Sequence, residues 1–215
     1  NKKMNPDQNY QKKITNFILE NEKDKKNINI LEFGVREGRS TKMFLELCAK
    51  NGGKLISVDI DDYSDLFQDI NWKFIKCRDD DHKHVSSFFS KKFDIILIDS
   101  LHEPNHVQKL IYTYWEYLNV NGSMYIDDIS WLPYVKNSWR VHKYTENINR
   151  DTFNKILEIQ LKNFENIYLT FAFEGSGMCR IIKLNENQLN KPVVIASRHY
   201  YVKKILKKII KIFKD

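Results

Sequence analysis

The sequence predicts an α/β fold: a doubly wound, mostly parallel, Rossmann-like sheet with a C-terminal β-hairpin and an amphipathic terminal helix. Short apolar runs alternate with segments of helical periodicity, as they do in βαβ units. The run FDIILI at 93–98 is apolar throughout, which is typical of a strand covered on both faces. Glycine or acidic residues directly follow several of the apolar runs. These positions are the strand ends at which α/β proteins bind ligands.

The individual elements follow from the spacing of the apolar residues. Helical spacing covers 8–22, 40–50, 83–90, 106–118 and 152–164. Strands are predicted at 28–33, 54–58, 72–77, 93–98 and 123–126. Turn residues end two of the helices, at Asn51-Gly52-Gly53 and at Asn121-Gly122. Segments 167–173 and 178–184 flank Glu174-Gly175-Ser176-Gly177 and predict a hairpin.

This pattern predicts one domain over residues 1–199 and a separate tail over 200–215. Within the domain, residues 130–150 lack clear periodicity and are expected to form an acceptor loop or lid. Their aromatic and basic side chains suit a sugar, a planar ring or a phosphate, although a lid packed on the core is an equal alternative. The side chains concerned are Trp131, Tyr134, Trp139, Arg140, His142 and Tyr144.

The tail carries most of the positive charge. The chain has a net charge of +7, and residues 203–215 hold six lysines and one aspartate, which leaves about +2 for the remainder. Nucleic acid is therefore not an expected partner of the domain. The tail is predicted to be an amphipathic helix with lysines on one face. It is expected either to dock on its own domain or a second copy, or to contact an anionic membrane surface.

Cysteine usage and hydropathy predict a reduced, cytoplasmic location, with peripheral membrane contact left open by the tail. Cys48, Cys77 and Cys179 are widely spaced and form no CxxC pair, so neither a disulfide framework nor a zinc knuckle is expected. No apolar run approaches the roughly 18 residues of a membrane span. No signal-peptide pattern is seen.

The most informative motif runs from Glu32 to Ser40, EFGVREGRS. A buried strand leads to Gly34, and a helix is predicted near Ser40, so the glycines at 34 and 38 let the backbone approach a ligand. Ser40 is expected to cap the helix or to bind the ligand. The spacing GxxxGxS differs from the GxGxxG of dinucleotide folds and lacks the Gly-Lys-Ser/Thr of a P-loop. Glu32 suits a ligand with a cationic ammonium group, such as S-adenosylmethionine.

Two further acids extend the expected cofactor site. Asp59 ends the second predicted strand, where a carboxylate can accept hydrogen bonds from both ribose hydroxyls. Asp79 follows the third strand and is the preferred candidate for the adenine amino group. An ordinary acidic turn is the alternative for Asp79.

The motif from Glu32 to Ser40, Asp59 and the order of strands resemble a class I methyltransferase. FDIILIDSLH at 93–102, followed by LNVNGSMYIDD at 118–128, resembles the methyltransferase-24 group, which is similar to the macrocin O-methyltransferase and cephalosporin-biosynthesis methyltransferase families. The resemblance covers about residues 28–130. The usual Gly-Gly before the fifth strand is Asn121-Gly122 here. The resemblance implies S-adenosylmethionine as cofactor, contacted by Glu32, Gly34, Val35, Gly38, Ser40, Asp59, Asp79 and Asp99.

The resemblance also implies a divalent cation at Asp99, Asp127 and Asp128, with His102 as a candidate base. The positions of the three acids agree with such a site, because all three follow predicted strands and would repel one another without a cation or protons. Hard oxygen ligands suit Mg²⁺ or Mn²⁺, which would lower the pKa of a bound acceptor hydroxyl. His102 would take that proton, assisted by Asp99 and Asp128. In a metal-free enzyme, Asp127 or Asp128 would be the base.

These features together predict an O-methyltransferase, assisted by a divalent metal, that acts on a sugar hydroxyl of a glycan or glycosylated metabolite. Another small molecule or a nucleic acid is an alternative acceptor. A protein with the fold but no activity, acting as a binding module or scaffold, is the alternative of a different class.

Overall fold

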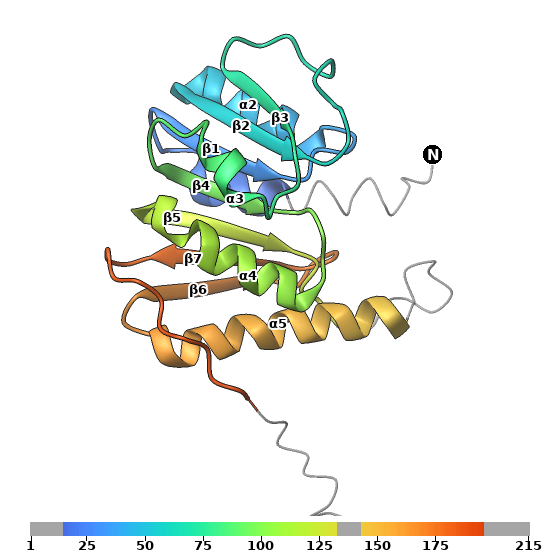
Figure 1. Cartoon of the computed structure of the whole chain (residues 1–215), viewed down its shortest axis with the longest axis vertical. Coiled ribbons are helices and arrows are strands. Elements are labelled where there is room, and N and C mark those ends of the chain that lie inside the picture. Colours follow the sequence, from blue (N-terminus) through green and yellow to red (C-terminus); the bar gives the residue numbers. More distant parts are fainter. Residues whose placement is uncertain (1–14, 133–142, 196–215) are drawn as a thin grey trace, which may run out of the picture.

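The fold is a seven-stranded sheet with helices on both faces (Figure 1). The structure is a computed structural model and describes residues 15–132 and 143–195. The strand order is β3-β2-β1-β4-β5-β7-β6. The first five strands are mutually parallel, whereas β7 pairs antiparallel with both β5 and β6. The predicted doubly wound, mostly parallel sheet is confirmed.

The strands are β1 (Ile28–Phe33), β2 (Gly53–Asp59), β3 (Trp72–Lys76), β4 (Phe93–Ile98), β5 (Leu118–Asp127), β6 (Ile167–Ala172) and β7 (Met178–Lys183). The helices are α2 (Arg39–Asn51), α3 (His82–Ser86), α4 (Pro104–Tyr114) and α5 (Lys143–Asn163), with a 3-10 turn η1 (Trp115–Tyr117) after α4. A further helix covers residues 15–22. No helix within the described ranges is long and apolar enough to cross a membrane.

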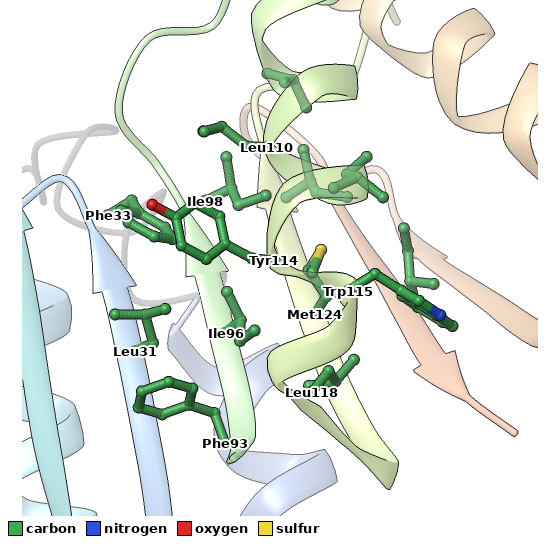
Figure 2. Packing of buried hydrophobic residues seen from close by; sticks show 14 of the residues in the cluster. Leu31, Phe33, Phe93, Ile96, Ile98, Leu110, Tyr114, Trp115, Leu118 and Met124 are labelled. Atoms are coloured by element: carbon green, nitrogen blue, oxygen red, sulfur yellow. The ribbon is translucent and has the colours of Figure 1, made fainter. Parts of the chain in front are cut away.

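Alternate residues of the central strands enter two separate cores. On one face, Leu31 and Phe33 of β1 join Ile96 and Ile98 of β4 beneath α4. Figure 2 shows Tyr114 of α4 beside Phe33, with Trp115 and Met124 in the same core; the Phe33 and Tyr114 ring centroids are 4.6 Å apart. On the other face, Ile30, Ile95 and Leu97 pack against α2 and the helix at 15–22. Burial on both faces explains why β4 is apolar throughout.

Several boundaries differ from the predicted ones. The helix predicted over 106–118 begins at Pro104 and ends at Tyr114, and β5 begins at Leu118, so Asn121-Gly122 does not terminate a helix. These two residues lie inside β5, where Asn121 has a φ of 63° and the register with β4 shifts. The helix predicted over 83–90 is a single short turn, α3.

The helix predicted over 152–164 begins nine residues earlier, at Lys143. Residues 143–150, expected within the loop of 130–150, are therefore helical. Their sequence KYTENINR is mostly polar, so apolar periodicity gives no signal there. Residues 133–142 and the tail at 200–215 lie outside the described residues.

The strand order reverses between β1 and β4, since β2 follows β1 on one side and β5 follows β4 on the other. At such a point the connections leave the sheet in opposite directions and open a crevice at the carboxyl ends of the strands. The amide of Asp99 donates to the Phe33 carbonyl and that of Gly34 to the Val58 carbonyl. The ends of β1, β2 and β4 are thereby held at one edge.

Candidate active site

The loop after β1 is held in a shape that requires glycine at two positions. Gly34 has a φ of 94° and Gly38 a φ of 71°. A Cβ at Gly34 would overlap the Asp99 carbonyl oxygen, and one at Gly38 would lie 2.7 Å from the Phe67 ring. Both glycines are thus required by packing within the protein itself, in addition to any ligand. Gly38 is also the N-cap of α2, so Ser40 lies inside the first turn. The prediction that Ser40 caps this helix is therefore wrong.

Asp59, at the end of β2, is bonded to this loop. Its Oδ2 accepts hydrogen bonds from the amides of Val35 at 2.7 Å and Arg36 at 3.4 Å, and its Oδ1 accepts one from Asp61 at 3.1 Å. The Val35 side chain is buried beneath the loop. A carboxylate oxygen has two lone pairs, so Oδ1 of Asp59, which accepts a single bond, keeps acceptor capacity for a ribose hydroxyl.

Glu32 is fully buried between β1, β2 and α2. Its Oε2 accepts hydrogen bonds from Thr41 Oγ1 at 2.7 Å and Ser57 Oγ at 2.6 Å. Burial raises the pKa of Glu32 to about 7, against the lowering effect of the Ser40, Ser57 and Thr41 hydroxyls. Its Oε1 has no hydrogen-bond partner among the described residues. A buried acceptor without a partner is costly, so it is suited to a ligand that brings a donor.

The ends of β4 and β5 bring two of the predicted acids to His102. His102 Nε2 lies 3.5 Å from Asp99 Oδ1 and 3.4 Å from Asp128 Oδ2. Burial raises the pKa of Asp99 well above its usual range, and repulsion from Asp127 and Asp128 raises it further. Asp128 has a φ of 58°, a left-handed conformation that is uncommon for a residue with a side chain. The predicted trio of His102, Asp99 and Asp128 is therefore close in space.

Asp127 belongs to the same acidic group but has a separate partner. Burial raises its pKa to about 6, as does repulsion from Asp128, while Ser176 lowers it. Its Oδ1 accepts a 2.6 Å hydrogen bond from Ser176 Oγ. No group of three or more His, Cys, Asp or Glu side chains is arranged to hold a metal ion within residues 15–132 and 143–195. The chemistry of the donor set nevertheless suits a hard divalent cation, because three mutually repelling carboxylates approach one another.

Asp79, the candidate for the adenine amino group, is tied to the loop after β4 and the start of α4. Its Oδ2 accepts hydrogen bonds from Ser100 Oγ at 2.5 Å and pairs with His106 Nε2 at 2.9 Å. The Tyr114 hydroxyl donates to its backbone carbonyl at 2.6 Å. These partners orient the side chain beside the loop that carries Asp99. His106 is thus engaged with Asp79.

Beside the acids, Trp131 packs among aromatic rings. Its ring centroid is 4.4 Å from that of Phe153 and 5.7 Å from that of Phe173. Phe153 and Phe173 are in turn partly buried against the main core. Tyr134, Trp139, Arg140 and His142, which were expected with Trp131 in the acceptor loop, lie outside the described residues.

Sequence reasoning missed three hydroxyls of this site, those of Thr41, Ser57 and Ser176. Thr41 and Ser57 contact Glu32, and Ser176 contacts Asp127. Ser57 lies in the middle of an apolar strand, which is a signal that a buried polar partner exists. Ser176 gives no such signal, because serine is common in hairpin turns.

The strand order and the glycine loop after β1 are those of the class I methyltransferase fold. Residues 31–129 match the family model of the methyltransferase-24 group, described as a methyltransferase domain. Residues 31–129 therefore match a methyltransferase domain, within a sheet that has the fold of class I methyltransferases. A search of curated protein sequences finds no match to the chain.

Solved structures with the same fold include three methyltransferases. MycE from the mycinamycin biosynthetic pathway, in complex with Mg and S-adenosylhomocysteine (SAH), has a TM-score of 0.62 at 16% identity, over 83% of this chain and 52% of MycE. SAH-bound PaMTH1 from Podospora anserina has a TM-score of 0.61 at 16% identity, over 81% and 78% of the two chains. TomG from Streptomyces achromogenes, in complex with SAM and involved in tomaymycin synthesis, has a TM-score of 0.57 at 11% identity, over 81% and 80%.

These identities establish a shared fold and do not transfer substrates. The chain spans about half the length of MycE. The acceptor and any metal therefore have to be argued from the residues of this chain.

Proposed function

We propose that the protein is an O-methyltransferase that transfers the methyl group of S-adenosylmethionine to a sugar hydroxyl, assisted by a divalent cation. The observation that carries the proposal is the meeting of two sets of residues at the switch point of the sheet. The first set is the glycine loop with Glu32 and Asp59. The second is the pair Asp99 and Asp128 with His102 between them.

The first set is suited to the cofactor. Asp59 has acceptor capacity for a ribose hydroxyl, and the open acceptor on Glu32 suits the donor-rich ammonium end of the ligand. A cationic group near Glu32 would favour its ionised form, against the burial that raises its pKa. Asp79, oriented by Ser100 and His106, is proposed for the adenine amino group.

The second set is suited to deprotonating an alcohol. His102 takes the acceptor proton at Nε2, while Asp99 and Asp128 stabilise the imidazolium that forms. The acceptor oxygen then attacks the methyl carbon as the bond from that carbon to sulfur breaks, which leaves SAH. Asp99, Asp127 and Asp128 would hold Mg²⁺ or Mn²⁺, and a bound cation would supply a lower pKa for the acceptor hydroxyl. Such a transfer depends mainly on position, so the role of the enzyme is to orient two substrates.

A sugar acceptor is supported by Trp131, and a divalent cation by a fold relative. Aromatic faces cover the apolar face of a sugar ring, and Trp131 lies three residues after Asp128. One structure of the fold relative MycE contains Mg, SAH and mycinamycin VI.

Calorimetric titration with SAH tests the cofactor half of the proposal. Asp59→Asn keeps the size of the side chain but replaces a charged acceptor with a neutral one, so we expect SAH affinity to fall roughly 10- to 100-fold. Asp62→Asn is the control, because Asp62 is an exposed acid of the same loop whose hydrogen bonds are to Ser64. Equal affinity in D59N and wild type would place the cofactor elsewhere. Failure of the wild-type protein to bind SAH would favour a non-catalytic scaffold.

A further inference from the structure

Ser176 lies in the turn between β6 and β7 and points at an acid of the proposed site. Its side chain is 1% exposed, and its hydroxyl donates to Asp127 Oδ1 at 2.6 Å. The register brings the two residues near each other, because Asp127 pairs with Met178 across the sheet and Ser176 is two residues before Met178. The left-handed φ of 78° at Gly177 turns the chain between Ser176 and the start of β7.

The backbone around Ser176 is fastened to the loop that carries the acids. The Ser130 amide donates to the Ser176 carbonyl at 2.6 Å, and the Ile129 amide donates to the Gly177 carbonyl at 3.2 Å. Gly177 has a φ of 78°, and a Cβ there would lie 2.5 Å from the Ser130 side chain. The β6–β7 turn is therefore in close contact with residues 129–130, which directly follow Asp127 and Asp128.

Turn formation alone would account for a serine at position 176, but it would not account for where the hydroxyl lies. The Gly177 amide closes the turn on the Glu174 carbonyl, and Gly175 takes the positive φ. A hydroxyl serving only the turn would face solvent or its own backbone. The hydroxyl of Ser176 is instead buried against the carboxylate of Asp127, which Asp128 repels.

We propose that Ser176 is a positioning residue that holds Asp127 by Oδ1 and leaves Oδ2 directed to a divalent cation shared with Asp99 and Asp128. This inference rests on the proposed function. Hydrogen bonds from residues behind the ligands commonly orient the carboxylates that bind metal ions. Here the β6–β7 turn would supply that support from a part of the chain remote in sequence from the acids.

The test is direct Mn²⁺ binding to the full chain, followed by electron paramagnetic resonance and compared with SAH affinity in the same preparations. Ser176→Ala is expected to weaken Mn²⁺ binding roughly tenfold or more, the usual effect of losing such a support. SAH affinity should stay within about twofold, because within the described residues no backbone hydrogen bond joins the glycine loop to this turn. Ser176→Cys keeps the side-chain size with a weak donor and should fall between wild type and S176A, which also covers a failure of S176A to fold.

Ser130→Ala is the matched control. It removes a buried hydroxyl from the same contact, one that donates to the Phe173 carbonyl and accepts from the Leu132 amide. It should leave Mn²⁺ affinity unchanged. Equal Mn²⁺ affinity in S176A and wild type, or an equal loss in S176A and S130A, would overturn the positioning role and leave the methyltransferase intact. A wild-type protein that binds SAH but not Mn²⁺ would overturn both this inference and the proposed cation site at Asp99, Asp127 and Asp128. One that does not bind SAH would refute the proposed function itself.

Discussion

Glu32 is a carboxyl group in an environment that disfavours its charged form. A carboxyl group with no exposed surface is kept in the core by two hydroxyls, and burial raises its pKa to about 7. The folded protein therefore binds a proton at Glu32 in a range where the unfolded chain, with a pKa near 4.5, has already released it. The contribution of this proton to the stability of the folded protein is complete below pH 4.5 and is lost as the pH rises through 7.

Glu32→Gln should remove this pH dependence. The free energy of unfolding of the wild type should fall by about 3 kcal/mol more than that of E32Q between pH 4.5 and pH 7.5, by the linkage of pKa shifts to stability. Asp99 and Asp127 shift in the same direction in both proteins, and because repulsion from Glu32 also raises the pKa of Asp99, the difference measures Glu32 together with that coupling. Urea unfolding without cofactor at several pH values measures it, with Glu46→Gln on the exposed side of α2 as control. Parallel curves for E32Q and wild type would contradict the account of Glu32.

Individual site residues could be proposed from the sequence because acids and glycines at strand ends have few other roles. The approach of His102 to Asp99 and Asp128 agrees with that reasoning. The structure adds a reason for Gly34 to the predicted one, since its missing Cβ makes room for the Asp99 backbone. Contacts such as Ser176 to Asp127 join residues 49 apart along the chain, and no local pattern encodes them.

Among the elements, the helix at 15–22 depends on a buried ion pair for its attachment to the sheet. Glu22, at its end, is fully buried and its Oε1 accepts from the Tyr125 hydroxyl at 2.7 Å and Arg180 Nη2 at 3.0 Å. Arg180, on β7, also donates to Asn21 and Ser123. This arrangement uses all three nitrogens of the guanidinium, which is why a lysine could not replace it.

Arg180→Met should cost about 3 kcal/mol of stability, the lower end of the range for a broken buried pair, because Glu22 stays buried and keeps only Lys25, 2.7 Å away, as a cationic partner. Arg150→Met is the control, since Arg150 is exposed and donates to Asn147 in the same helix. Urea unfolding gives the magnitude, and hydrogen exchange should show faster exchange in residues 15–22. A loss below about 1 kcal/mol would mean that the pair contributes no more than a surface salt bridge.

The elements themselves were largely predictable where the apolar pattern was strong. The bounds of β1 and β4 agree with the predicted strands, and the hairpin of β6 and β7 lies where its turn residues indicate. The first part of α5 could not be predicted, because its polar sequence resembles a loop. Asn121 is a residue type that favours turns, and it does adopt a left-handed conformation. It lies within β5, however, and does not end a helix.

At the scale of the whole molecule, the alternation of strands and helices was enough to predict the parallel sheet and its crevice. The antiparallel β7 places the β6–β7 turn beside the acids after β5. That long-range pairing follows from the complete sheet and from no single segment. The order of strands therefore determines which residues meet, and the cofactor half and the acceptor half of the proposed site adjoin at the point where the order reverses.

A crystal structure of the protein with SAH and Mn²⁺, with anomalous diffraction at the manganese edge, tests the central claim most directly. The account predicts SAH over the loop from Gly34 to Gly38 with its ribose at Asp59, and one anomalous peak contacted by Asp99, Asp127 and Asp128. A cofactor bound away from that loop, or a well-occupied SAH site with no anomalous peak at the three acids, would contradict it.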